Sequence, residues 1–446
     1  MPFTKGSLFN SNDFTKSKKD IKELYAKEYY CNIALDAKAY IDIEKNSAKL
    51  IYRVNPKTLC HFGNIEINSS KNIDKKIAKS LLYFHKNELF SFENIKRSYK
   101  NIYAFDGVTQ ASIETDIKES GNVDISYTLS ETQKPLHFKM GIGASSDEGF
   151  MLEMGLKDRN FYGNLKTLTL EGRVTQLKQR VKASYSMPLF HRDMLGAEVG
   201  LENEDFDAFS EYRLFSSLYL MQRNLPHNFK ESVILERTSS YDSKDLALFT
   251  EKTLHIVSAM IEWSYDKRDN LLNPQNGYFL NAMLMGSLKG SISDATYSKV
   301  KFSAGYIYPF FSSILASKVS YGNIEKYAGE IPSSYRFYGG GMSSNRAYLY
   351  RKMGPKNSDN DAIGFNSIIE STFEYRFAIA GNFRAVLFND NSYIPQSKYE
   401  KKTIYNSGGV GLRYVSPIGP IAFDVGFDLK EPRETSAFHF HIGESF

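Results

Sequence analysis

The sequence lacks any long apolar run. No stretch approaches the roughly 18 apolar residues that a membrane-spanning helix requires, and the mean hydropathy is negative. A helical membrane protein is therefore excluded. A soluble all-β protein and a transmembrane β-barrel both stay open, because the apolar residues of a barrel alternate with polar ones and escape a hydropathy window.

The sequence also has few cysteines and only a small excess of positive charge. Cys31 and Cys60 are the only cysteines, which fits a reducing compartment or a single disulfide, and the disulfide is the less expected of the two. The net charge is +5 without a long basic block, so nucleic acid is not expected as a partner. Residues 1–19 contain no apolar core of a signal peptide, which at face value indicates a cytosolic protein.

Enzyme signatures are absent from the sequence as well. It has no phosphate-binding glycine loop ending in Lys-Ser/Thr, no nucleophile elbow and no metal-ligand spacing of cysteines. We therefore expect no enzymatic activity, no cofactor and no metal site.

Aromatic residues, in contrast, are plentiful: 32 phenylalanines and 30 tyrosines help to bring the aromatic fraction to 14%, which is typical of strands. Over residues 135–446, short alternating segments separated by turns show no helical period. In IAFDVGFDL, Ile421 and Phe423 face one way and Asp424 and Asp428 the other. About 16 such segments predict an all-β transmembrane barrel of antiparallel strands, with lipid outside and water inside. A soluble sandwich rarely continues this long.

The first 134 residues contain an internal repeat. KGSLFNSNDFTKSKKDIKELY, from Lys5, aligns with KNELFSFENIKRSYKNIY, from Lys86, at one constant offset, as two copies of one unit do. The second copy, over residues 57–134, reads strand, helix, helix, strand, strand, whereas the first, over residues 1–56, lacks the leading strand and helix. The chain thus begins inside a repeat, so we expect upstream sequence with a signal peptide. One interpretation is a generic α+β domain; the other is a POTRA domain, a periplasmic module that receives polypeptide by strand addition.

The longest loop of the expected barrel is SSYRFYGGGMSSNRAYLYRKMGP, over residues 333–355, between about the eleventh and twelfth strands. Loops of this length are usually functional or disordered, and the tyrosines and phenylalanines argue against disorder. Inside the lumen Arg346 would need carboxylates, for which Glu374 and Asp390 on the next strands are the candidates. Three consecutive glycines would allow the inward turn: Gly339, Gly340 and Gly341.

The run GGGMSSNRAY resembles the inward-folded loop motif of the BamA superfamily, an aliphatic residue followed by Arg-Gly and then Phe or Tyr. Arg346 and Tyr348 occupy motif positions, and Ala347 stands where the family usually has glycine. By this resemblance, Glu374 and Asp390 are the acidic partners of the arginine. Further matches cover nearly the whole chain: DKRDNLLNPQNG from Asp266, LKDRNFYGN from Leu156, and GVGLRYVSPIGPIAFDVGFDL from Gly409.

Within the superfamily, the short loops, the few POTRA units and the PIGPIAFDVGFDL ending look most like TamA, the outer-membrane subunit of the translocation and assembly module. This likeness implies a chain in the bacterial outer membrane with its POTRA domains in the periplasm. It also implies a TamB-like partner anchored in the inner membrane, client outer-membrane β-barrel proteins, and contact with outer-membrane lipid.

The two ends of the barrel carry further candidate residues. His439 and His441 share one face of the last segment, and we interpret them as lumenal polar residues rather than as a metal site. The opposite face resembles the C-terminal signal by which outer-membrane barrels are recognised for insertion: Phe438, Phe440, Ile442 and Phe446. If the first strand pairs with the last, three glycines weaken the seam between them by removing side-chain packing: Gly141, Gly143 and Gly443.

The leading hypothesis is therefore a barrel-assembly factor that opens laterally at this seam and templates client strands on the unpaired edge. The alternative is a two-partner-type polypeptide secretion pore, which also combines a few POTRA units with about 16 strands. A passive porin fits less well, because porins need no periplasmic repeats. Secretion requires an open lumen and assembly tolerates a plugged one, so conductance would separate them.

Overall fold

The structure is a computed structural model that describes residues 3–189, 193–224, 226–396, 401, 403–417, 419–442 and 444. These residues divide into two compact units. The first contains most of the chain up to Pro135, and the second contains the barrel strands from Leu136 onward. No helix in the described ranges is long and apolar enough to cross a membrane.

The N-terminal unit begins with a helix and a β-hairpin. The side chain of Asn10 caps the helix by accepting a hydrogen bond from the N–H of Asn12. On the buried face of the helix, the hydroxyl of Ser17 lies 2.6 Å from that of Tyr52 on the hairpin. The elements are α1 (Ser11–Lys27), β1 (Ala34–Asp42) and β2 (Ser47–Asn55).

A three-stranded sheet with two helices completes this unit. Its strand order is β3-β5-β4, with β3 parallel and β4 antiparallel to β5. The rings of Phe62 and Phe84 stack at 4.1 Å in its core. The elements follow one another as strand, helix, helix, strand, strand, the order read from residues 57–134: β3 (His61–Ser69), α2 (Lys75–Ser80), α3 (Phe92–Ile102), β4 (Val108–Ile117) and β5 (Asn122–Glu131).

Cys31 and Cys60 form a disulfide that ties the chain after α1 to the start of β3. The backbone brings the two residues together, because the N–H of Cys60 donates to the carbonyl of Tyr29 at 2.9 Å. The expectation of unpaired cysteines is therefore wrong. The sequence separation of 29 residues gave no sign of this backbone contact.

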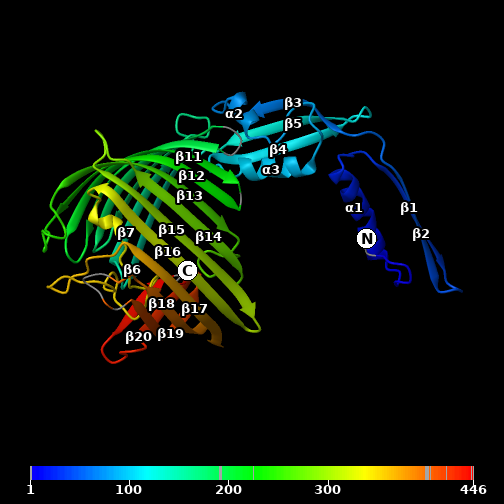
Figure 1. Cartoon of the computed structure of the whole chain (residues 1–446). Helices are drawn as coiled ribbons and strands as arrows, with labels where there is room; N and C mark the ends of the chain where they lie inside the picture. Colours follow the sequence, from blue (N-terminus) through cyan, green and yellow to red (C-terminus); the bar gives the residue numbers. More distant parts are fainter. Residues whose placement is uncertain are drawn as a thin grey trace. The chain divides into compact units, whose positions relative to one another are not determined.

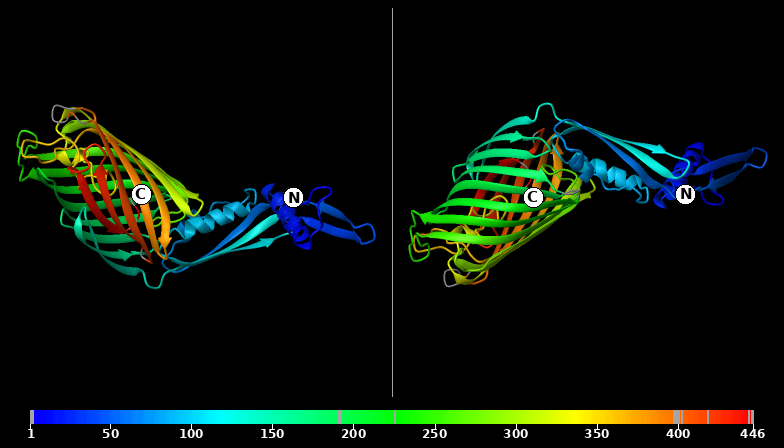
Figure 2. Two further views of the ribbon diagram at one scale, coloured as in Figure 1. Left: turned by 90° about the horizontal axis from the view of Figure 1, so that it is seen from below. Right: turned by 90° about the horizontal axis from the view of Figure 1, so that it is seen from above.

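The second unit is one 16-stranded sheet in which each strand is hydrogen-bonded to the next along the chain. The strands curl into the wall of a nearly closed barrel (Figures 1 and 2), so the predicted barrel is confirmed. The strands are β6 (Leu136–Ser145), β7 (Gly149–Asp158), β8 (Thr167–Val174), β9 (Lys178–Pro188), β10 (Asp193–Asp205), β11 (Ser210–Asn224), β12 (His227–Tyr241), β13 (Thr253–Asp266), β14 (Gly277–Ser287), β15 (Ala295–Phe310), β16 (Ser313–Gly329), β17 (Ser367–Ala380), β18 (Phe383–Tyr393), β19 (Ile404–Ser416), β20 (Gly419–Asp428) and β21 (Ser436–Ile442).

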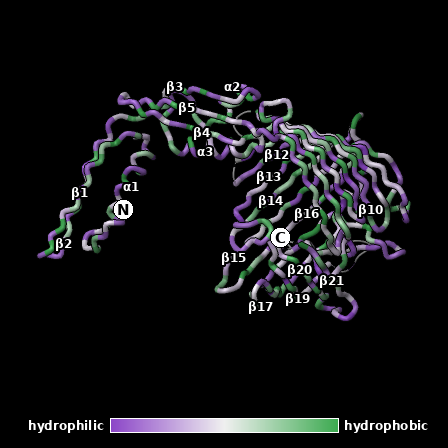
Figure 3. Tube along the Cα trace, turned by 180° about the vertical axis from the view of Figure 1, so that it is seen from behind, coloured by the Kyte–Doolittle hydropathy of each residue, from purple (hydrophilic) through white to green (hydrophobic). Residues whose placement is uncertain are grey.

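Polar and apolar residues alternate along these strands (Figure 3). On β20, Phe423 and Phe427 are 41% and 37% exposed on the outer face, whereas Asp424 and Asp428 are fully buried on the inner face. This two-sided pattern is that of a wall with lipid outside and polar groups inside.

The connection between β16 and β17, the eleventh and twelfth strands of the barrel, is the long loop, residues 330–366. It begins with the short helix η1 (Ser333–Tyr335). Tyr335 packs against wall residues such as Ile256 and Tyr297, while Met353 and Phe365 pack with Ile394 and other wall residues. The loop is therefore folded against the inside of the wall.

The turn between β13 and β14, residues 267–276, is also ordered. The Asp269 carboxylate accepts backbone N–H groups from Asn270, Gln275 and Asn276. A side chain placed on Gly419, which precedes the body of β20, would meet Leu272 at 3.5 Å. Several strands separate β13 from β20 in the sheet, so this turn reaches across one mouth of the barrel.

Candidate functional site

Arg346 lies inside the barrel with its guanidinium completely buried among carboxylates. Nε and Nη2 each lie 2.9 Å from an oxygen of Asp390, so the guanidinium and the carboxylate form a bidentate ion pair. Nη1 lies 2.6 Å from Glu374 Oε1 and 3.2 Å from Asp424 Oδ2. Cζ lies 3.5 Å from the ring centroid of Phe388, which adds a cation–π contact. The two acids expected from the sequence thus contact the arginine, together with a third.

Two further arginines join this group, Arg413 through Asp424 and Arg376 through Glu374. The oxygens of Asp424 accept from Arg413 Nη1 at 2.5 Å and Nη2 at 3.0 Å. Arg376 Nη2 lies 2.6 Å from Glu374 Oε2, and Glu444 lies 3.1 Å from Arg413 Nε. We call these side chains the arginine cluster: Arg346, Arg376, Arg413, Glu374, Asp390, Asp424 and Glu444.

Every side chain of the arginine cluster is at most 2% exposed. Charges in such a dry region are tolerated only when each has its partners. Removing one partner leaves an uncompensated buried charge, which costs about 3–5 kcal/mol. The cluster therefore attaches the loop at Arg346 to four neighbouring strands: β17, β18, β19 and β20.

Tyr348, the aromatic residue of the loop motif, has a carboxylate partner of its own. Its hydroxyl donates to Asp428 Oδ2 at 2.5 Å, and its ring meets that of Tyr405 edge-on at 5.6 Å. Beside it, the side-chain amide of Asn345 donates to the carbonyl of Tyr405 at 3.2 Å. These contacts extend the attachment of the loop along β19 and β20.

Two of the three loop glycines are needed for the conformation of the backbone. Gly340 and Gly341 have φ values of +96° and +101°, which other residues rarely adopt. Gly339 has no such φ, but a side chain there would come within 2.3 Å of Met353.

Ala347 does not have a positive φ, so the family's glycine at this position is not required here by backbone strain. The residue that must be a glycine is instead on β20, where the backbone of the loop lies close to the backbone of the strand. A side chain on Gly426 would lie 2.2 Å from the carbonyl oxygen of Arg346. Gly426, which the sequence does not single out, is thus the glycine that admits the loop.

The loop also meets both ends of the barrel sheet. Asp147, in the turn after β6, accepts the N–H of Met342 through Oδ2 at 3.1 Å. Its Oδ1 lies 3.4 Å from Nδ1 of His439 on β21. The other ring nitrogen of His439 lies 3.1 Å from the carbonyl oxygen of Arg346. First strand, last strand and loop therefore meet around Asp147 and His439.

Strands β6 and β21 are the two ends of the sheet and form no ladder with each other in the described part of the chain. The N–H of Ser146 donates to the carbonyl of Phe440 at 3.0 Å, next to the junction just described. Farther along β6, a side chain on Gly141 would lie 4.0 Å from Glu153, and one on Gly143 would lie 3.2 Å from Met151, both on the neighbouring strand β7. That Gly141 and Gly143 weaken the seam stays a prediction, and Gly443 falls outside the described residues.

The remaining candidates lie on the last strand. Phe438 and Ile442 are 53% and 42% exposed, on the face that Phe440 shares, and Phe446 falls outside the described residues. His441 points inward, with Nε2 at 3.7 Å from Asp424 Oδ2. No group of three or more His, Cys, Asp or Glu in the described residues is arranged to hold a metal ion.

A second set of contacts holds the loop to the opposite side of the wall. Lys352 Nζ lies 2.5 Å from Asp207, and Arg351 pairs with Glu204. The Tyr335 hydroxyl donates to Glu236. The loop therefore spans the lumen from β10–β12 to β17–β21.

Comparison with known proteins gives a family match over the barrel. Residues 160–446 match a family model described as the Omp85 superfamily domain. A relative from Nitratidesulfovibrio vulgaris, named outer membrane protein assembly factor BamA, is 24% identical over 334 residues, 69% of this chain and 41% of the relative. Another of that name, from Neisseria meningitidis serogroup B, is 21% identical over 390 residues, 73% of this chain and 48% of the relative. The chain spans less than half the length of these relatives.

Solved structures share the fold. BamA from Haemophilus ducreyi lacking POTRA domains 1–3 is similar with a TM-score of 0.78 at 18% identity, covering 99% of this chain and 95% of that one. CdiB from Acinetobacter baumannii is similar with a TM-score of 0.58 at 13% identity, covering 96% and 80%. CdiB from Escherichia coli has a TM-score of 0.60 at 13% identity, covering 97% and 84%.

Proposed function

Since the chain belongs to the Omp85 superfamily, a family of non-enzymatic proteins of the bacterial outer membrane, we propose that it is an outer-membrane protein assembly factor that adds client strands at the gap between β6 and β21. The observation that carries the proposal is the unpaired gap itself. Within the described residues, no ladder joins the facing edges of the two end strands, and an exposed strand edge recruits another strand.

The side chains along β6 favour this use of the gap. Its outward residues Leu136, Phe138, Met140 and Ile142 are 59–81% exposed, as expected of a strand facing lipid. Gly141 and Gly143 add no side chain to the inner face of this strand. A client strand arriving here would complete its hydrogen bonds and bury its apolar face in lipid, which supplies the driving force without a nucleotide.

The wall is shorter near this gap. Strands β6, β7 and β8 have 10, 10 and 8 residues, whereas β15 and β16 have 16 and 17. A transmembrane strand needs about 9–11 residues, so β6–β8 provide a span near the minimum. Lipid beside short strands must thin to match them, at a cost for each ångström of mismatch, and thinned lipid is easier for a new strand to enter.

For the N-terminal unit, we propose a POTRA domain at residues 57–134 and part of another at residues 1–56. The strand, helix, helix, strand, strand order supports this assignment, as does the position of β3 and β4 as the edge strands of the sheet. Following the TamA-like features of the sequence, we further propose that a TamB-like protein anchored in the inner membrane docks on this unit, and that the clients are outer-membrane β-barrel proteins.

The competing function is a two-partner-type secretion pore, for which the fold shared with the CdiB structures is the supporting observation. A pore must clear its lumen for the passing chain. Here the loop crosses the lumen and buries Arg346 among three carboxylates, and withdrawing it would break the arginine cluster. The arrangement therefore favours assembly over transport.

The test is reconstitution of the purified chain in liposomes. An unfolded outer-membrane protein is added, and its folding is followed by heat-modifiable migration in SDS gels. We expect faster client folding than in empty liposomes, together with low ion conductance. Client folding at the rate of empty liposomes, with a large steady conductance, would instead indicate a pore.

A further inference from the structure

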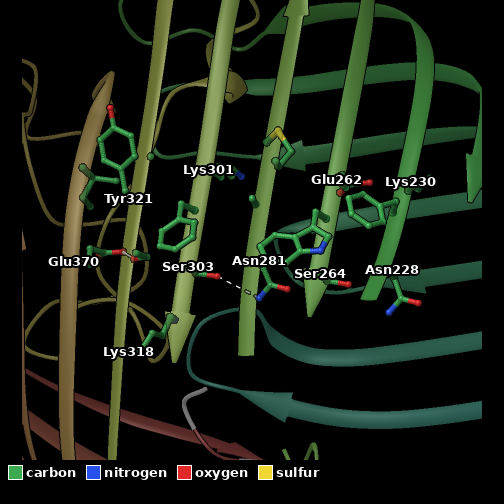
Figure 4. Close-up of a pocket in the computed structure, with 18 of the residues that line it drawn as sticks. Asn228, Lys230, Glu262, Ser264, Asn281, Lys301, Ser303, Lys318, Tyr321 and Glu370 are labelled. Carbon is green, nitrogen blue, oxygen red and sulfur yellow. Dashed lines mark hydrogen bonds between the residues drawn. The ribbon is translucent and has the colours of Figure 1, made fainter. Parts of the chain in front are cut away.

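A cavity of about 650 Å³ lies along strands β11–β17, and Figure 4 shows the residues that line it. The strand register shows that it is on the lumenal face. Lys230 is opposite Glu262, Glu262 opposite Met283, and Met283 opposite Lys301, so these side chains form one row across four strands. Phe337 of the loop contributes to its lining.

A second row runs beside the first and is made of uncharged polar groups except at its end. We call it the polar row, and Figure 4 labels most of its members. Each residue is opposite the next on the neighbouring strand: Asn228, Ser264, Asn281, Ser303, Ser320 and Glu370. With strands about 4.8 Å apart, the polar row is about 24 Å long, enough for roughly seven residues of extended chain.

Two charges in the first row, Lys301 and Glu262, make no hydrogen bond and no close ion pair among the described residues, although each lies in the electrostatic field of the other. Lys301 Nζ has no carboxylate within ion-pair distance and makes a ring contact, 5.8 Å from the centroid of Phe337. Glu262 makes no hydrogen bond or ion pair there. The other charges are engaged: Lys230 with Glu198 at 3.7 Å, Lys318 with the Ser343 carbonyl at 3.2 Å, and Glu370 with Ser320 at 3.3 Å.

We propose that this cavity binds an extended polypeptide segment in which a carboxylate lies next to an aromatic side chain. The carboxylate pairs with Lys301, and the aromatic ring packs between Met283 and Phe337. Amide and hydroxyl groups of the polar row bond the backbone, and Glu262 accepts N–H groups. The inference rests on the proposed handling of client chains, and adds a lumenal contact separate from the gap between β6 and β21.

The carboxylate can belong to the end of a chain or to an acidic side chain, and the experiment separates these sources. The probes are three fluorescein-labelled nonapeptides of alternating threonine and phenylalanine. The first ends in a free carboxylate, the second is amidated, and the third is amidated with one internal aspartate. Binding to the full chain in detergent micelles is measured by fluorescence anisotropy, with empty micelles as background.

We expect the amidated peptide without aspartate to bind at least tenfold more weakly than the better of the other two. Which of those two binds more tightly identifies the source of the carboxylate. Equal binding of all three would overturn the proposal.

Variants of the cavity test the site itself. Lys301→Met, which keeps the length of the side chain, should weaken the tight complex at least tenfold, and Lys301→Arg should stay within threefold of wild type. Lys289→Met, at an exposed cation in the β14–β15 connection, should have no effect. Heat-modifiable migration checks that each variant is folded. Wild-type affinity in folded Lys301→Met would contradict the proposal.

Cross-linking gives a second measure that does not depend on affinity. The native cysteines are both in the disulfide, so an introduced cysteine is the single free thiol. Ser303→Cys on the polar row should cross-link to a peptide carrying a central cysteine, whereas Ser317→Cys, on the outer face of β16, should not. The same result in a protein whose β6–β21 gap is closed would show binding in the lumen even if strand addition fails. Equal cross-linking at both positions would exclude the cavity.

Discussion

Asp147 and His439 connect opposite ends of the barrel sheet, with Oδ1 of the aspartate 3.4 Å from Nδ1 of the histidine. The same aspartate holds the loop at Met342, and the same histidine contacts the backbone of Arg346. Opening of the gap and movement of the loop therefore disturb the same contacts, and the two motions should be coupled.

Replacing Asp147 tests this coupling. Asp147→Ala removes the acceptor for Met342 and the partner of His439, so the loop tip should become accessible. The measurement is the rate of thiol labelling at Met342→Cys, with and without Asp147→Ala, and we expect an increase of about tenfold. Asp359→Ala, at an exposed position of the same loop, is the matched control and should leave the rate unchanged. No acceleration by Asp147→Ala would mean that the junction does not hold the loop.

Arg346→Ala leaves Asp390 buried without its counter-charge and takes one of two arginines from Glu374, which keeps Arg376. The change should cost about 3 kcal/mol locally. The loop should become protease-sensitive and client assembly should fail, while the barrel keeps its strand ladder and resists SDS at room temperature. Arg346→Lys should rescue poorly, because an ammonium cannot pair with three acids through a planar fork. Limited proteolysis and client folding are compared for wild type and both variants. Wild-type behaviour of the alanine variant in both assays would show that Arg346 is needed neither to hold the loop nor for client assembly.

Asp424→Asn tests an acid that sequence reasoning did not pair with the arginine. It takes a negative charge from both Arg346 and Arg413, so the predicted loss is about 3–5 kcal/mol. The midpoint of unfolding, read by heat-modifiable migration, should fall more than for Asp428→Asn, which affects only Tyr348 among the loop contacts described above. Equal midpoints for the two variants would show that the arginine cluster does not act as a unit.

A disulfide across the gap tests lateral opening. Continuing the antiparallel register from Ser146 and Phe440 by two residues places Ala144 opposite Ile442. In a background of Cys31→Ser and Cys60→Ser, the pair Ala144→Cys and Ile442→Cys should cross-link under oxidation, leave a folded barrel and block client assembly. Reductant should restore activity. Each single cysteine variant serves as the control, and full activity of the oxidised protein would rule out opening at this gap.

The orientation of the barrel is tested at the β13–β14 turn. Short turns of outer-membrane barrels face the periplasm. Leu271→Cys, at a side chain that is 67% exposed, should therefore react with an impermeant maleimide only after the outer membrane is permeabilised. Labelling in intact cells would reverse the orientation.

Much of the fold was predictable because the strands follow from the local alternation of apolar and polar residues. Alternation in segments such as IAFDVGFDL gave the barrel and its approximate strand number, and the motif run around Arg346 gave the superfamily, both of which are confirmed. The loop was also placed between the correct strands. These features depend on neighbours in sequence or on a motif.

The contacts within the arginine cluster were harder to predict, because they depend on the register of the strands. Alternation put Asp424 on the lumenal face, but nothing in the sequence says which residue of the loop reaches it. Gly426 read as one more small lumenal residue, although it admits the backbone of Arg346. The disulfide was missed for the same reason, since the contact between Tyr29 and Cys60 joins elements that no local pattern relates.

The turn between β13 and β14 has an electrical consequence. The turn lies over one mouth, with Leu272 next to Gly419 and Asn273 Oδ1 3.5 Å from Arg384 Nη1. We therefore expect it to add an electrical resistance in series with that of the lumenal loop. Ions then meet two constrictions in succession, and removing either one alone leaves the other to limit the current. Single-channel recordings should therefore change little when the turn is shortened in wild type and rise steeply when it is shortened together with Arg346→Ala, a more-than-additive change in conductance.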